Sequence, residues 1–152
     1  WTVLKNDTPQ SPTISYFHNL FYMHSGTIYW EHPSGLENYV FENNIVMIDK
    51  LYHVSDTDPF TADYNLFVSQ SPRDSFQGVH GAHFTSVDDI EFADPDNLDF
   101  TMSLDSPAKD KGKVISGYND DAIGVPDIGP FEYGQPPGPD WPRPRSTTFQ
   151  TP

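Results

Sequence analysis

The 152-residue sequence contains no cysteine, and it has only 8 Lys and Arg against 22 Asp and Glu, which gives a net charge of −14. Without cysteine there is no disulfide framework, no thiolate zinc site and no cysteine nucleophile. The shortage of basic residues argues against nucleic acid and anionic membrane surfaces as partners, because both require Lys and Arg to neutralise phosphate. No apolar run approaches the roughly 18 residues of a membrane-spanning helix, so we expect no membrane insertion.

Helix signals are almost absent before Gly134, since no stretch repeats apolar residues at helical spacing over three turns. Short runs rich in β-branched and aromatic residues occur instead, separated by Gly, Pro, Asn, Asp and Ser. These runs predict strands at residues 14–17, 27–30, 39–41, 45–48, 66–68 and 113–115. Alternating apolar residues at 98, 100, 102 and 104 predict one more strand with a buried face. We therefore expect an all-β chain.

Composition divides the chain once. Residues 135–152 hold six prolines in 18 positions, and such a stretch forms neither a helix nor a central strand. We interpret residues 1–134 as the folded domain and residues 135–152 as a proline-rich linker or tail.

A repeat indicates the connectivity. Asn19, Asn44 and Asn65 are each followed by an aliphatic and then a large apolar residue, at spacings of 25 and 21 residues. That period suits one circuit of a parallel β-helix, whose equivalent residues stack about 4.8 Å apart, so that each Asn can hydrogen-bond the next. We expect the left-handed backbone of each turn at these Asn residues, which tolerate it. The alternative is that each Asn simply marks a separate turn.

The second half of the domain carries a family resemblance. It contains Asp94-Pro95, Asp99-Phe100, Ser106-Pro107-Ala108, Asp110, Gly112 and the string from Asp127 to Tyr133. Together with the Asn segments, this resembles the C-terminal end of bacterial secreted right-handed parallel β-helix proteins, a superfamily with pectate-lyase-like, glycoside-hydrolase-like and anchored surface members. The resemblance covers about residues 14–134. It implies a right-handed parallel β-helix segment of about two to three coils with a C-terminal cap, in an extracellular or cell-surface location.

The ends of a β-helix expose unpaired strand edges and apolar core, so terminal coils are normally covered. We assign residues 88–134 to this cap, with Phe131 and Tyr133 over the open end of the coil. Nothing at the amino end resembles a cap. We therefore expect the chain to be the C-terminal fragment of a longer β-helix, resting on upstream coils, or to stack on another copy of itself.

His80 and His83, followed by Asp88 and Asp89, are the catalytic candidates. A His-x-x-His pair beside carboxylates can carry general acid–base chemistry or bind a metal. The alternative is a polar loop that binds nothing.

Asp94, Asp96 and Asp99 form an oxygen-rich stretch of the kind that hard cations prefer. They are candidates for a structural Ca²⁺, and no other cofactor is expected. The alternative is an Asp-rich solvated turn.

Tyr22, Tyr29, Trp30 and Tyr52 are candidates for carbohydrate binding. Their rings can stack on sugars, although the same rings can instead fill or cover the core.

Two functions remain open. The first is an extracellular β-helix module that forms the C-terminal part of a larger polysaccharide-binding or polysaccharide-processing protein. If that protein is an enzyme, it is a polysaccharide lyase or glycoside hydrolase with most catalytic residues outside this chain. The second is a non-catalytic cell-surface or fibre-forming protein that stacks through open coil ends.

Overall fold

The computed structural model describes residues 2–5, 14–23, 27–31, 39–48, 50–53, 60–69, 78–120 and 122–135. Almost all of the proline-rich stretch, residues 136–152, therefore lies outside the described residues. Its interpretation as a linker or tail stays a prediction.

The described part of the chain is rich in strands and contains two short 3-10 helices. In chain order these elements are β1 (Thr2–Lys5), β2 (Ile14–Phe17), β3 (Leu20–Tyr22), β4 (Thr27–Glu31), β5 (Tyr39–Glu42), β6 (Ile45–Met47), β7 (Lys50–His53), β8 (Phe60–Asp63), β9 (Leu66–Val68), β10 (Ala82–Phe84), η1 (Val87–Ile90), β11 (Phe92–Asp94), η2 (Pro95–Asn97) and β12 (Asp99–Met102). Within these residues, no helix is long and apolar enough to cross a membrane.

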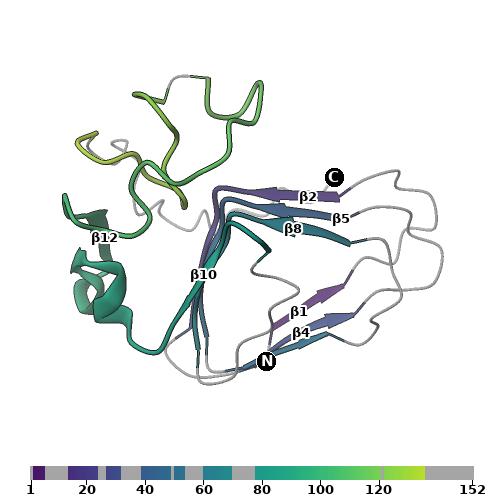
Figure 1. Cartoon of the computed structure of the whole chain (residues 1–152). Coiled ribbons are helices and arrows are strands. Elements are labelled where there is room, and N and C mark those ends of the chain that lie inside the picture. Colours follow the sequence, from purple (N-terminus) through teal and green to yellow (C-terminus); the bar gives the residue numbers. More distant parts are fainter. Residues whose placement is uncertain are drawn as a thin grey trace, which may run out of the picture.

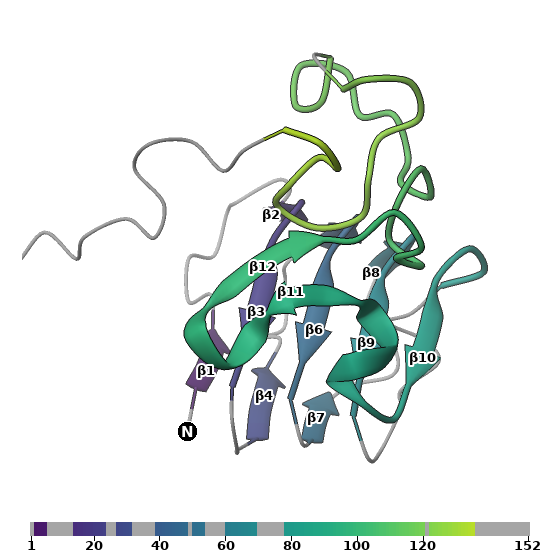
Figure 2. The same cartoon turned by 90° about the vertical axis from the view of Figure 1, so that its left-hand side faces the viewer.

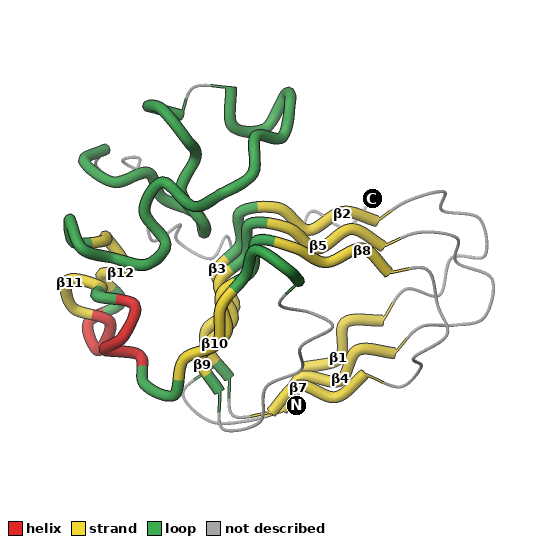
Figure 3. Tube along the Cα trace, in the orientation of Figure 1, coloured by secondary structure: helices red, strands yellow, loops and turns green. Residues whose placement is uncertain are grey.

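The first nine strands visit three sheets in turn, and β10 then joins the third sheet beside β9. The sheet orders are β1-β4-β7, β2-β5-β8 and β10-β9-β6-β3, and every pairing within them is parallel. Each third strand therefore lies beside its counterpart from the previous circuit of the chain, and we call one such circuit a coil. Figures 1 and 3 show the three sheets as three sides around a common interior.

The sequence located five of these strands and misplaced two runs, and it did not predict β1, β3, β7, β8, β10 or β11. The strands predicted at residues 14–17, 27–30, 39–41, 45–48 and 66–68 are confirmed to within one residue. Residues 113–115 form no strand. The run from 98 to 104 is only partly correct, because Leu98 is a left-handed residue that ends η2 and Leu104 is exposed. The remaining strand, β12, pairs antiparallel with β11.

The third sheet, β3-β6-β9-β10, is apolar on both faces. Val46 and Phe67 face the interior, where they join the buried cluster of Tyr39 and Phe41 from the second sheet. Their neighbours in the strands, such as Ile45 and Leu66, face outward and are equally buried. A strand that is apolar on both sides must be covered on both sides.

The outward face is covered by residues 86–120 and 122–133, which we call the C-terminal cover. Ile90, Phe100, Ala108 and Ile128 of this cover are buried against the outward residues of the third sheet, Ile45, Met47, Leu66 and Val68. Figure 2 shows β11 and β12 in front of β3, β6 and β9. Our prediction that residues 88–134 close the end of the coil is therefore wrong. Because the third sheet is apolar on its outward face as well as its inward face, these residues pack on the outward face and not over the end of the coils.

The three predicted Asn residues form one hydrogen-bonded row. The Oδ1 atom of Asn44 accepts from the backbone N and the Nδ2 of Asn19, both at 3.0 Å. The Oδ1 atom of Asn65 accepts in the same way from Asn44, at 2.9 and 3.1 Å. Asn44 also donates to the carbonyls of Tyr16 and Glu42 at 2.9 Å, so one side chain joins three coils.

The left-handed backbone lies one residue before each Asn of the row. His18, Asn43 and Tyr64 have φ values of 53°, 57° and 55°. Our expectation that the stacked Asn residues are themselves left-handed is therefore wrong. The bend comes first, and the following Asn then presents its backbone N–H and its amide to the same acceptor in the next coil.

We predict that Asn44→Ala destabilises the fold by about 3 kcal/mol or more, because each buried polar group left without a partner costs about 1–3 kcal/mol. Asn97→Ala is the matched control, since its exposed side chain bonds only Asp94 within the described residues. We expect the control to cost less than about 1 kcal/mol. Urea unfolding monitored by circular dichroism measures both values, and equal losses would contradict a special role for the row.

Candidate functional site

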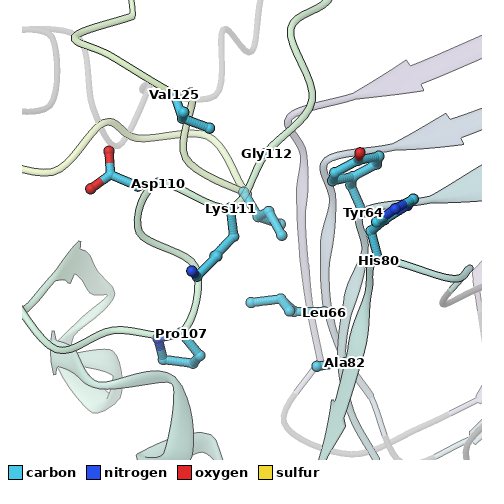
Figure 4. A pocket seen from close by; sticks show the side chains of 10 residues that line it. Tyr64, Leu66, His80, Ala82, Pro107, Asp110, Lys111, Gly112 and Val125 are labelled. Atoms are coloured by element: carbon cyan, nitrogen blue, oxygen red, sulfur yellow. The ribbon is translucent and has the colours of Figure 1, made fainter.

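A groove of 560 Å³ lies between the last coils and the C-terminal cover (Figure 4). Its volume falls in the range of small-molecule sites, about 300–1,000 Å³. The lining is mainly apolar with a few charged groups. It is formed by Tyr64, Leu66, His80 and Ala82 from the coils and by Pro107, Asp110, Lys111, Gly112, Val125 and Ile128 from the cover.

Asp63 holds His80 at the edge of this groove. One Asp63 oxygen accepts from the backbone N of His80 and the other contacts Nδ1 of the imidazole, both at 2.7 Å. The ring of Tyr64 stacks on the imidazole at 4.5 Å between centroids, with an interplanar angle of 12°. The His80 side chain is 56% exposed, and no described residue hydrogen-bonds its Nε2. An imidazole oriented by a carboxylate in this way can accept or donate a proton at Nε2.

The hydrogen bonds around Asp63 also affect its own ionisation. Partial burial alone would raise the pKa of the Asp63 carboxyl. The hydrogen bonds from the side chain and backbone of His80 and from the backbone of Tyr64 outweigh that effect, so the pKa of Asp63 lies below its ordinary value. Asp63 therefore remains ionised beside His80 throughout the neutral and mildly acidic range.

Gly78 allows the chain to reach this position. Its φ is +79°, and a Cβ at this residue would lie 2.4 Å from the Asp63 Cα and 2.5 Å from the Ala62 carbonyl oxygen. The chain therefore passes directly over Asp63, and two residues later His80 meets the carboxylate. The sequence pattern did not predict Asp63, because the carboxylates close to His80 in the sequence, Asp88 and Asp89, lie downstream of it. The feature that could have identified Asp63 is its position just before Tyr64-Asn65, because the following coil stacks on that part of the chain.

The other catalytic candidates do not join this pair. His83 lies in β10 and contacts the carbonyl of Ser69 through Nε2 at 2.8 Å. Asp88 and Asp89 lie in the first turn of η1, where the Asp89 carboxylate accepts from the backbone N of Ser86. His83 and Asp89 have partners of their own, and among the described residues no hydrogen bond joins them or Asp88 to His80. A catalytic site built from His80, His83, Asp88 and Asp89 stays a prediction.

The acidic stretch proposed for Ca²⁺ has local hydrogen-bond partners. Asp94 caps η2 by accepting from the backbone and side chain of Asn97, at 3.3 and 2.8 Å. Asp99 accepts from the N and Oγ1 of Thr101, and these hydrogen bonds lower the pKa of Asp99. Asp96 is exposed. The described residues contain no group of three or more His, Asp or Glu side chains that could hold a metal ion, and Ca²⁺ at this turn stays a prediction.

The aromatic candidates lie in different surroundings. Tyr22 packs against Phe100 of the cover in a T-shaped contact with 5.1 Å between centroids, and its role as a sugar platform stays a prediction. The parallel register aligns Tyr29 of β4 with Tyr52 of β7, next to Trp30. The side chains of these three residues lie outside what the structure describes, and their role stays a prediction.

Comparison with protein-family models, with curated proteins and with solved structures gives no significant match.

We predict that Gly78→Ala destabilises the protein by about 3 kcal/mol or more. The strain of a left-handed residue costs about 1–2 kcal/mol, and the clash with Asp63 adds to it. Gly117→Ala is the matched control, because Gly117 has φ +84° and nothing within 4 Å of the added Cβ. We expect it to cost about 1 kcal/mol. Thermal unfolding of the two variants tests the difference, and equal costs would mean that Asp63 and the residues beside it move away freely.

Proposed function

We propose that this chain is a right-handed parallel β-helix module of an extracellular protein that binds or processes a polysaccharide. Three sheets visited in turn, with all pairings parallel in register, support the fold. The Asn row along one corner of the coils supports it further. The resemblance to the C-terminal end of secreted β-helix proteins is the reason for proposing a polysaccharide as the ligand and an extracellular location.

The observation that carries the binding function is the groove with the stacked Tyr64 and His80 at its edge. A pyranose has apolar C–H faces and a rim of hydroxyl groups. A mainly apolar lining suits the faces, while Lys111, Asp110 and the free edge of His80 can bond the hydroxyls.

The Asp63–His80 pair gives the same groove a means of proton transfer. The carboxylate fixes the imidazole through Nδ1, and Nε2 can exchange a proton with a bound molecule. Such an arrangement is compatible with glycan cleavage as well as with binding. The proposal therefore includes a processing activity, with further catalytic groups supplied by other parts of the protein.

We predict that the chain binds at least one member of a polysaccharide panel, and that Tyr64→Ala weakens this binding about tenfold, or about 1.4 kcal/mol, because a stacked ring contributes about this much. Tyr118→Ala is the matched control, since Tyr118 is 68% exposed and does not line the groove. Affinity electrophoresis measures binding, and reducing-sugar release and unsaturated-product absorbance measure turnover. No binding to any polysaccharide, or an equal loss in the two variants, contradicts the proposed site.

A second function, stacking through coil ends, is favoured by one observation. In the described part of the chain, β1, β2 and β3 each have a parallel neighbour on one side only. An unpaired strand edge can accept another strand, from upstream coils or from another copy of the chain.

If copies stack, association will increase with salt, because the net charge of −14 makes like chains repel at low ionic strength. Sedimentation velocity at increasing concentration and salt tests this prediction, and electron microscopy shows whether filaments form. A single species of 17.2 kDa under all conditions would rule out stacking by this chain alone.

A further inference from the structure

His18 connects the first coil to the C-terminal cover through both ring nitrogens. Its Nε2 lies 2.9 Å from Nδ2 of Asn43 in the second coil and 2.9 Å from Nδ2 of Asn119 in the cover. Its Nδ1 lies 3.0 Å from the carbonyl oxygen of Gly129, also in the cover. One imidazole therefore joins three segments that are far apart in the sequence.

The two amides that face Nε2 cannot be reversed. Asn43 pairs with the backbone of Lys113 through both ends of its amide, accepting from N and donating to O at 2.7 Å each. Asn119 accepts from the backbone N of Ile115 at 2.8 Å and donates to the Lys113 carbonyl at 2.8 Å. Turning either amide would place carbonyl oxygen against carbonyl oxygen. Both groups at Nε2 are therefore N–H donors.

These partners admit one protonation state of His18. Nε2 must present its lone pair to the two donors, and Nδ1 must carry the hydrogen that bonds Gly129. The imidazole is then neutral. A proton on Nε2 would set three donors against one another and break the contacts to Asn43 and Asn119.

Charged groups around this contact are already paired. The Lys113 ammonium, beside Asn43, bonds the Glu42 carboxylate at 2.8 Å. The Asp127 carboxylate accepts from the backbone N of Asp110 and of Tyr133. In the cover next to Asn119, the Asp120 carboxylate accepts from the backbone of Gly117. None of these groups donates a hydrogen bond to His18.

We propose that His18 is a proton-controlled latch for the C-terminal cover. At neutral pH the uncharged ring docks residues 113–120 and 122–129 on the first two coils, and protonation of Nε2 undocks them. The same segment supplies Val125 and Ile128 to the groove, so undocking also dismantles one of its walls. The effect on a bound polysaccharide rests on the proposed function, whereas the latch itself does not.

The direction of the pH effect follows from the surroundings of the ring. Burial lowers the pKa of His18 below its ordinary value of 6.5, and this outweighs the Gly129 hydrogen bond and the Asp127 charge, which raise it. The undocked His18 therefore takes up a proton near pH 6.5, while the docked one does not. Docking is complete above that pH and weakens as the pH falls toward the lowered pKa, by up to about tenfold per pH unit for one proton. Asp63 and Asp99, whose pKa values lie below 3.8, titrate outside this window.

Nitrogen-15 NMR of the histidines and amide hydrogen exchange of the cover test the latch without any ligand. We expect the Nδ1–H form of His18 at pH 7.5, a pKa below 6.5, and faster exchange in residues 113–129 between pH 7.5 and 5.5 after correction for intrinsic rates. Gln at position 18 keeps a neutral hydrogen-bonding side chain, so His18→Gln should abolish the pH dependence. His83→Gln is the control and should retain it.

An Nε2–H tautomer, a pKa at or above 6.5, or unchanged protection of the cover at pH 5.5 would overturn the proposal. The NMR measurement on the unmodified protein decides the matter even if His18→Gln does not fold. If the latch behaves as expected but no polysaccharide binds, the latch stands and only the proposed function fails.

Discussion

The two apolar faces of the third sheet are the constraint on which the rest of the structure depends. Its inward residues fill the coil interior, and its outward residues need a second layer. The chain supplies that layer from its own C-terminal segment, which returns along the side of the coils. The groove and the contacts of His18 both lie at this junction. They are therefore consequences of covering the outer face of the sheet.

Two adjacent asparagines hold the two layers together by different means. Asn44 points into the coils, where its amide joins the row. Asn43 has a left-handed backbone, and it pairs with Lys113 while its own carbonyl accepts from Gly129. Because the left-handed backbone of Asn43 turns the chain, the Asn43 side chain meets the cover while the Asn44 side chain meets the coils, and one bend serves both. Both side chains are fully buried. Each polar atom of the two amides therefore needs a hydrogen-bond partner within the protein.

The sequence predicted five of the strands and the Asn row because both depend on local pattern and on a regular period. It misjudged the cover because a terminal segment with aromatic residues suits an end cap and a side cover equally. Unbroken apolar runs at 45–48 and 66–68 were the available signal, since a strand with one solvent face alternates. The partners of His80 and His18 could not be predicted, because they lie 17 and 111 residues away and depend on how the layers dock.

The candidate site lies where the repeat becomes irregular. The register partners Leu20, Ile45, Leu66 and Ala82 are separated by 25, 21 and then 16 residues, so the final coil is shorter than those before it. The Asn of the row is replaced there by Gly81, and the chain crosses tightly over Asp63 at Gly78. A row of amides favours coils of the same shape. Coils that repeat in this way do not bring a different set of reactive side chains together in any one of them. The shortened coil breaks this uniformity, bringing an imidazole onto a carboxylate beside the groove. If Gly78→Ala separates the pair while the Asn row persists, the regular coils supply stability and the irregular one supplies the site.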